Sequence, residues 1–115
     1  NPAKNFADTR NAQRSSDVVQ ILNAVTQYTS EQGQSLSGLG VVPLCSTTPA
    51  VIGTGGVDLA AELVPTYIVG IPVDPQPLGD AADTGYTICQ TDGRVEISAP
   101  NALTDTVDKT ITVKR

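Results

Sequence analysis

The chain has 115 residues, a length typical of one domain, with 12 acidic against 7 basic residues and a net charge of −5. This negative balance opposes the attraction to phosphate backbones that drives non-specific nucleic-acid binding. The chain has no histidine, which is the most frequent general base and metal ligand. Composition therefore argues against nucleic-acid binding, zinc sites and histidine-based catalysis. With one Phe and no Trp or Met, the core must come from Val, Ile, Leu and Ala.

The first 32 residues predict one long amphipathic helix. They hold one proline, Pro2, and no glycine, whereas all ten glycines follow from Gly33 onward. Asn1 suits the N-cap, Pro2 the first helical position, and Gly33 the residue after the C-cap. Apolar side chains recur at spacings of three and four at Val18, Ile21, Leu22, Val25 and Tyr28. We expect the second half of segment 1–32 to pack on the domain and the polar first half to project.

Residues 33–84 form a connecting region that is rich in glycine and proline and predicts mostly irregular structure. Within this region, residues 57–64 predict a short helix that ends before Pro65. A connection of this length inside a compact domain is usually functional or held in place by a link from outside it.

The last part, residues 85–115, predicts a small antiparallel sheet of about three strands. Segments 86–90 and 94–98 alternate between apolar and polar residues, and the Asp92-Gly93 pair between them is a strong hairpin signal. Residues 110–114 alternate again and supply a third strand. The alternation predicts one inward face, made of Tyr86, Ile88, Val95, Ile97, Ile111 and Val113. The expected fold is a single α+β domain, with the long helix packed on this sheet.

The two cysteines, Cys45 and Cys89, are too far apart in the chain for a C-x-x-C metal or redox motif. In an acidic chain rich in threonine, glycine and proline, we expect them to form a disulfide, which indicates an oxidising compartment outside the cytoplasm. Two free buried thiols are the alternative. Cys89 lies on the opposite strand face from Ile88, so a disulfide requires the connecting region to run over the outer face or the edge of the sheet.

Four stretches, taken in order, carry a resemblance to a known family. They are residues 1–4 with 10–21, residues 63–75 with the Pro-Val-Asp-Pro sequence at 72–75, residues 84–88, and residues 93–100 with 110–114. In this order they resemble the exit of the spine helix, the segment before the sheet, and the strands of type IV pilins and the related pseudopilins. The start departs from the family, whose members open with a prepilin signal and about 25 largely apolar residues, enough to span a bilayer. The chain is expected to be a soluble piece that lacks this segment.

The resemblance implies a structural role. The subunit would be anchored in the membrane through the missing segment and then stacked, through its N-terminal helix, with like subunits into an extracellular filament on a bacterial surface. The polar first half of the helix suits packing against neighbouring helices, where opposite charges fix the register. The expected subunit-interface residues are Lys4, Phe6, Asp8, Arg10, Arg14 and Asp17. For each of them, a solvent-exposed helix face is the alternative.

Two other functions stay open, namely a minor or tip pilin that acts as an adhesin through the loop at 46–56, and a secretion-system pseudopilin. An enzyme is disfavoured because the serine and threonine hydroxyls have no histidine to act as base. The glycines at 53–56 also lack the Lys-Ser/Thr that follows in a phosphate-binding loop. We expect no cofactor and no nucleic acid bound by this domain alone. Adhesion, motility, DNA uptake and secretion are all compatible with the sequence.

The acidic loop at 74–83 raises the question of a calcium site. Asp74, Asp80 and Asp83 supply the oxygen ligands that calcium prefers. The chain has no EF-hand spacing and no glutamate in this loop, and aspartate is frequent in turns for its own hydrogen bonds. We therefore expect these residues to form turns, and no metal.

Overall fold

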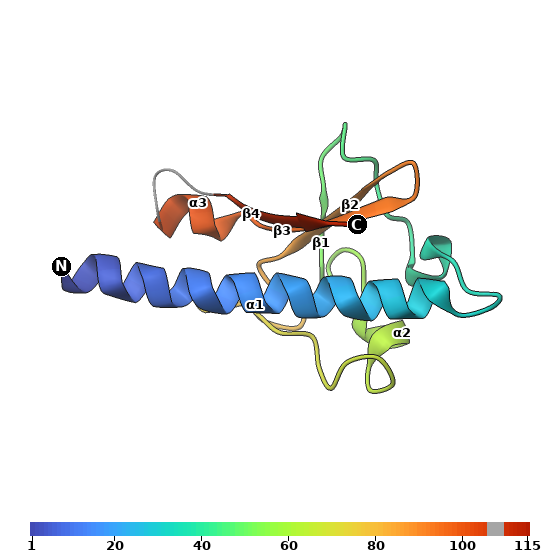
Figure 1. The fold of residues 1–115 in the computed structure, drawn as a ribbon, viewed down its shortest axis with the longest axis horizontal. Coiled ribbons are helices and arrows are strands. Elements are labelled where there is room, and N and C mark those ends of the chain that lie inside the picture. Colours follow the sequence, from blue (N-terminus) through green and yellow to red (C-terminus); the bar gives the residue numbers. More distant parts are fainter. Residues whose placement is uncertain (106–109) are drawn as a thin grey trace.

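The protein is described by a computed structural model that covers residues 1–105 and 110–115. One long helix, α1 (Pro2–Ser30), packs against a four-stranded antiparallel sheet in the order β1-β2-β3-β4 (Figure 1). The strands are β1 (Ala50–Val51), β2 (Thr87–Thr91), β3 (Arg94–Ala99) and β4 (Ile111–Lys114). Short helices are η1 (Leu36–Leu39), α2 (Ala60–Leu63) and α3 (Asn101–Asp105). The α+β class is confirmed, with β1 as an additional strand. Residues 106–109 of the expected sheet segment lie outside the described residues.

Helix α1 begins as its sequence predicts and ends slightly earlier. The Asn1 side chain accepts a hydrogen bond from the Ala3 N–H at 3.0 Å, and Pro2 occupies the first turn. The helix ends at Ser30 and its C-cap, Glu31, is extended, so Gly33, with φ of 84°, lies in the turn that follows. The expectation that Gly33 directly follows the C-cap is therefore wrong. Figure 1 shows the first turns of α1 extending past the sheet, below α3.

The core lies between α1 and the inner face of the sheet. Ile88 pairs with Ile97 and Ile97 with Val113, so these side chains share one face. Of the predicted inward residues, four are buried and the last two are partly buried against the core: Tyr86, Ile88, Val95 and Ile97, then Ile111 and Val113. Burying a large aliphatic side chain contributes about 1.5–3 kcal/mol, so this face is a main source of stability.

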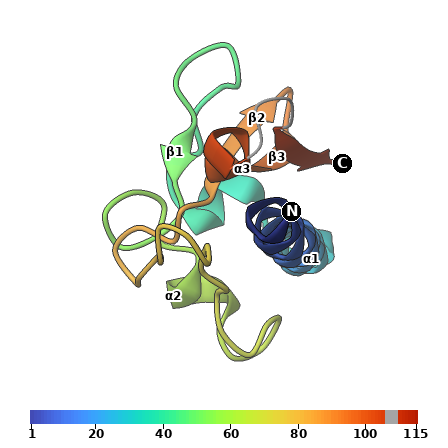
Figure 2. The same ribbon diagram turned by 90° about the vertical axis from the view of Figure 1, so that its left-hand side faces the viewer.

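The connecting region runs along the edge of β2. A disulfide joins Cys45 to Cys89, and Leu44 forms a parallel bridge with Gln90. Strand β1 then pairs antiparallel with β2, placing Ala50 opposite Ile88. The predicted disulfide and the predicted path along the sheet edge are both confirmed. In the end-on view of Figure 2, α2 and the loops around it lie beside α1, on the side away from the C-terminal end of β4.

Candidate functional site

A network of buried charges fastens the middle of α1 to the rest of the domain. The Arg14 side chain is fully buried and its guanidinium donates from Nε and Nη2 to the two carboxylate oxygens of buried Asp74, each at 2.9 Å. Its Nη1 donates to Asp105 at 2.6 Å, and its Nη2 also donates to the Gln76 carbonyl oxygen at 2.6 Å. Arg10 donates to both oxygens of Asp105, at 2.7 and 3.0 Å. Two carboxylates thus neutralise two neighbouring arginines and link α1 to α3 and to the loop before β2.

Asp17 extends the buried polar contacts of α1 by one turn. The Tyr86 hydroxyl donates to Asp17 Oδ2 at 2.6 Å, and the Gln13 amide donates to Asp17 Oδ1 at 2.7 Å. Only 1% of Asp17 is exposed. Tyr86, which directly precedes β2, is therefore hydrogen-bonded to the helix that covers the sheet.

These contacts correct the expectation that Arg14 and Asp17 lie at a subunit interface. Both side chains are inside the domain, so neither is available to a neighbouring helix, and Arg10 is mostly covered by its pairing with Asp105. The polar first half of α1 was expected to project because its own sequence has no apolar stripe. A signal was nevertheless present, since Arg14 and Asp17 each stand four positions, about one helical turn, before Val18 and Ile21, in line with the buried face.

The electrostatics of this network favour a structural role. Hydrogen bonds from Arg10, and then from Arg14, lower the pKa of Asp105 to about 2. Burial, and then the hydrogen bond to Asp17, raise the pKa of the Tyr86 hydroxyl. Near neutral pH the Asp105 carboxylate stays ionised and the Tyr86 phenol stays protonated. These groups are therefore set to hold α1 in place rather than to exchange protons.

The other expected interface residues lie on the exposed N-terminal end of α1. Lys4 and Asp8 form an ion pair at 2.8 Å in which both side chains are largely exposed. Phe6, the only phenylalanine of the chain, is 64% exposed. An exposed ion pair of this kind contributes little to the stability of the domain. Contact of Lys4, Phe6 and Asp8 with neighbouring subunits stays a prediction.

The three aspartates of the 74–83 loop do not converge. Asp74 is paired with Arg14. Asp80 Oδ1 accepts hydrogen bonds from the N–H groups of Ala82 and Asp83 at 2.9 and 2.8 Å, and the carboxylate of Asp83 accepts one from the Gly85 N–H at 2.9 Å. Asp80 and Asp83 thus make the turns that the sequence predicts.

One further group of possible metal ligands is found within residues 1–105 and 110–115. It consists of Cys45, Cys89 and Glu96. The two sulfur atoms of this group are joined in the disulfide, so they are not thiolates that could bind an ion.

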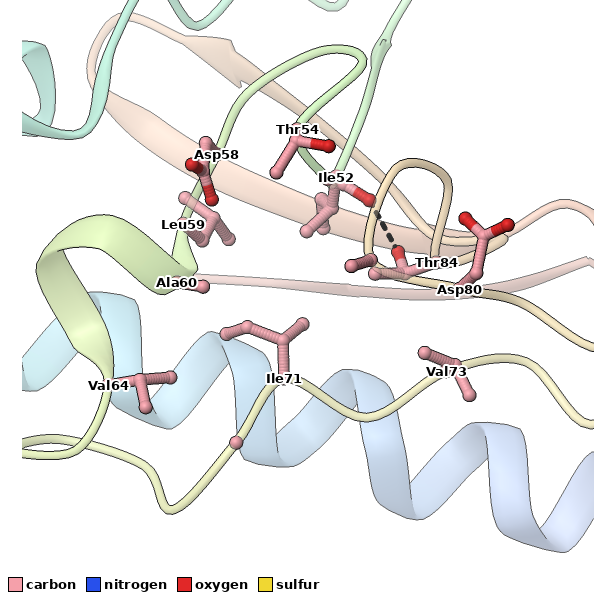
Figure 3. A pocket seen from close by; sticks show the side chains of 13 residues that line it. Ile52, Thr54, Asp58, Leu59, Ala60, Val64, Ile71, Val73, Asp80 and Thr84 are labelled. Atoms are coloured by element: carbon pink, nitrogen blue, oxygen red, sulfur yellow. Dashed lines mark hydrogen bonds between the residues drawn. The ribbon is translucent and has the colours of Figure 1, made fainter.

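A small apolar pocket, which the sequence did not predict, lies between three loop segments of the connecting region (Figure 3). Its volume is about 240 Å³, and Asp58 and Asp80 are among its lining residues. Its apolar walls include Ile52, Leu59, Val64, Ile71 and Val73. The loops hold one another, since the Thr84 hydroxyl donates to the Ile52 carbonyl oxygen at 2.7 Å (dashed line in Figure 3). The residues that line the pocket come from several separate stretches between Ile52 and Thr84, so no short sequence pattern predicts it.

Across the part of the chain that the structure describes, no helix has both the length and the apolar character that a membrane span requires. A long N-terminal helix packed on an antiparallel sheet, together with a disulfide, is compatible with a pilin-like fold. No protein-family model matches the chain, and neither the curated proteins nor the solved structures include a significant match to it.

Proposed function

We propose that this chain is the globular part of a type IV pilin-like subunit, which assembles with copies of itself into a bacterial surface filament through α1. The observation that carries the proposal is the exposed side chain of Phe6, the sixth residue of the chain, near the start of α1. The first turns of this helix extend past the sheet (Figure 1). A large aromatic side chain that its own domain leaves uncovered is suited to an interface with another copy.

The rigid attachment of α1 supports the same role. At 1.5 Å per residue, the 29 residues of α1 span roughly 43 Å, close to the longest dimension of the molecule, 50 Å. The pairs of Arg14 with Asp74 and Asp105 hold the helix at its middle, one turn before its apolar core contacts begin at Val18. A subunit held in a filament by one end of such a helix would present its domain at one defined angle.

The disulfide between Cys45 and Cys89 supports assembly outside the cytoplasm, because disulfides persist in oxidising compartments. In the proposal, an apolar helix ahead of Asn1 anchors the subunit in the membrane before assembly, and the described domain remains outside. The partners are then other pilin subunits, and the domain itself needs no cofactor.

The pocket of the connecting region favours a second candidate, a minor subunit at the filament tip that binds a ligand through these loops. The two candidates differ in abundance. A major subunit makes up most of the mass of purified filaments, whereas a tip subunit is a trace component.

The proposal is tested by joining an apolar helix of about 25 residues, enough to span a bilayer, ahead of Asn1 and measuring incorporation into filaments. Phe6→Ala is expected to reduce the incorporated fraction while leaving the melting temperature of the domain unchanged. Val41→Ala is the matched control, because Val41 is 91% exposed but lies in the connecting region. Equal incorporation of both variants and the parent would contradict assembly through the exposed end of α1.

A further inference from the structure

Two groups of like-charged residues lie on opposite sides of the domain. We call one side the acidic face, made of Asp58, Glu62, Asp80 and Asp83 around α2 and the pocket. The other side is the basic edge, made of Arg94, Lys114 and Arg115 at the start of β3 and the end of β4. Figure 2 shows α2 at the lower left and the C-terminal end of β4 at the upper right, with the sheet and α1 between them.

The acidic face carries negative charge without a neutralising cation. Among the described residues, none of its four carboxylates is in an ion pair, whereas Asp8, Asp74, Glu96 and Asp105 all are. Asp58 and Asp80 line the apolar pocket, from different loops (Figure 3). The face therefore combines an apolar cavity with carboxylates near it, which suits a partner group that has an aliphatic stem and a cationic head.

The basic edge carries groups of that kind, although its three cations stand beside two acidic residues, Glu96 on β3 and the exposed Asp92 in the turn before it. Lys114 is 70% exposed in its side chain and stands 3.7 Å from Glu96, a loose contact. Arg94 donates to the Arg115 carbonyl oxygen at 3.0 Å, Arg115 donates to the Asn23 side chain at 3.2 Å, and both arginines are exposed. β4 is the outer strand of the sheet. Lysine and arginine bury their stems on apolar surfaces while their charged ends stay at polar groups.

We propose that the basic edge of one copy docks on the acidic face of a second copy, with one lysine or arginine stem in the pocket. This inference rests on the proposed function, because it names the contact between neighbouring domains in the filament. The pocket of about 240 Å³ is smaller than the ~300–1,000 Å³ of typical small-molecule sites and suits a single large side chain. The two surfaces lie on opposite sides, so the contact is head to tail and leaves a free surface at each end.

Such a contact is weak between free domains. Exposed ion pairs are individually weak, and one side chain in a pocket covers far less than the ~1,200 Å² of a stable interface. Isolated copies are therefore expected to be monomeric at micromolar concentration and to associate at millimolar concentration. In a filament, α1 holds the domains side by side, and the high effective concentration makes the contact persistent.

The contact is measured by NMR on the ¹⁵N-labelled chain as its concentration rises into the millimolar range at low salt. Amide signals of both surfaces are expected to shift together, and to return when the salt is raised to about 1 M, where charges act over only about 3 Å. Absence of these shifts, or shifts confined to the N-terminal end of α1, would overturn the proposal.

Charge reversal identifies the two surfaces. Asp58→Lys with Glu62→Lys reverses the acidic face, and Arg94→Glu with Arg115→Glu reverses the basic edge. Neither double variant alone is expected to show the shifts, because its two surfaces then carry like charges. An equimolar mixture restores them, because the unaltered basic edge of the first variant meets the unaltered acidic face of the second, and the two reversed surfaces also carry opposite charges. The restored shifts also show that both variants are folded. Shifts in either variant alone, or none in the mixture, would overturn the proposal.

A matched control keeps the net charge and moves charges elsewhere. Lys4→Glu with Asp8→Lys exchanges an exposed ion pair on α1, far from both surfaces, and is expected to leave the shifts as in the parent chain. Arginine amide, a small organic cation, is added in a separate titration. If the amide signals of the acidic face shift with arginine amide but not with rising concentration of the chain, the pocket takes a small cation and the proposal fails.

Filament assembly separates this inference from the function on which it rests. In the form with an apolar helix ahead of Asn1, each charge-reversed variant alone is expected to assemble poorly, and the two expressed together to assemble well. Normal assembly of each variant alone would overturn the inference and leave the proposed function standing. No assembly of the unaltered form, with the NMR shifts intact, would refute the proposed function and leave the contact between copies standing.

Discussion

Replacing Arg14 with methionine is expected to lower the free energy of unfolding by about 3–5 kcal/mol, because it leaves the wholly buried Asp74 without its cation. Methionine has a similar length and no charge, so the change removes the paired hydrogen bonds and leaves much of the packing. Domains of this size are stable by only about 5–15 kcal/mol, so the variant loses a large part of the total.

The loss is measured by urea unfolding followed by circular dichroism, with linear extrapolation to water. Lys4→Met is the matched control, since it is the same kind of change on the same helix in an exposed ion pair, and it is expected to cost at most about 0.5 kcal/mol. Arg14→Met combined with Asp74→Leu is expected to recover most of the loss, because both buried charges are then absent.

The reasoning is refuted if Arg14→Met costs less than about 1 kcal/mol, because an unpaired buried carboxylate is far more costly than that. It is also refuted if adding Asp74→Leu increases the loss rather than reducing it. Either result would mean that Asp74 does not depend on Arg14 for compensation of its charge.

Further predictions concern acid, the disulfide and one glycine. The pKa of Asp105 is lowered to about 2, so its ionised form stabilises the fold by about 1 kcal/mol after solvent screening, and this stabilisation is present above pH ~4 and lost as the pH falls toward 2. Asp105→Asn should therefore flatten the acidic part of a profile of melting temperature against pH. An unchanged slope would contradict this prediction. Reducing the Cys45–Cys89 disulfide, which joins residues 44 positions apart, should lower the free energy of unfolding by about 4 kcal/mol. Urea unfolding with and without reductant measures this loss, and equal midpoints would contradict it. Gly53→Ala should lower the melting temperature by about 4 °C or more, because Gly53 has φ of 151° and a Cβ would collide with the Ala82 carbonyl oxygen. An unchanged melting temperature would show that alanine fits this position without strain.

Local patterns predicted most of the fold. The spacing of Val18, Ile21 and Val25 identifies the helix face that packs on the sheet, and the Asp92-Gly93 turn identifies the hairpin, because both signals are complete within a few residues. Strand β1 escaped prediction because two residues are too few to show an alternation, and its pairing with β2 depends on the path of the whole connecting region.

The buried network was not predicted, because its members are distant in the chain. Arg14 meets Asp74 and Asp105, which follow it by 60 and 91 positions, and a polar side chain gives no sign of whether such partners exist. The apolar pocket was missed for the same reason. Lys4, Phe6 and Asp8 are exposed at the end of α1 that was expected to project, beyond these long-range contacts, and their place at a subunit interface stays a prediction.

The central claim, that this chain is a filament subunit that assembles through α1, is tested most directly by electron microscopy with antibodies against the domain. Cells that carry the chain with an apolar helix ahead of Asn1 are compared with cells that lack it. The account predicts surface filaments labelled along their whole length, and none when the chain is absent. Label confined to filament tips, or filaments that persist unlabelled without the chain, would contradict it.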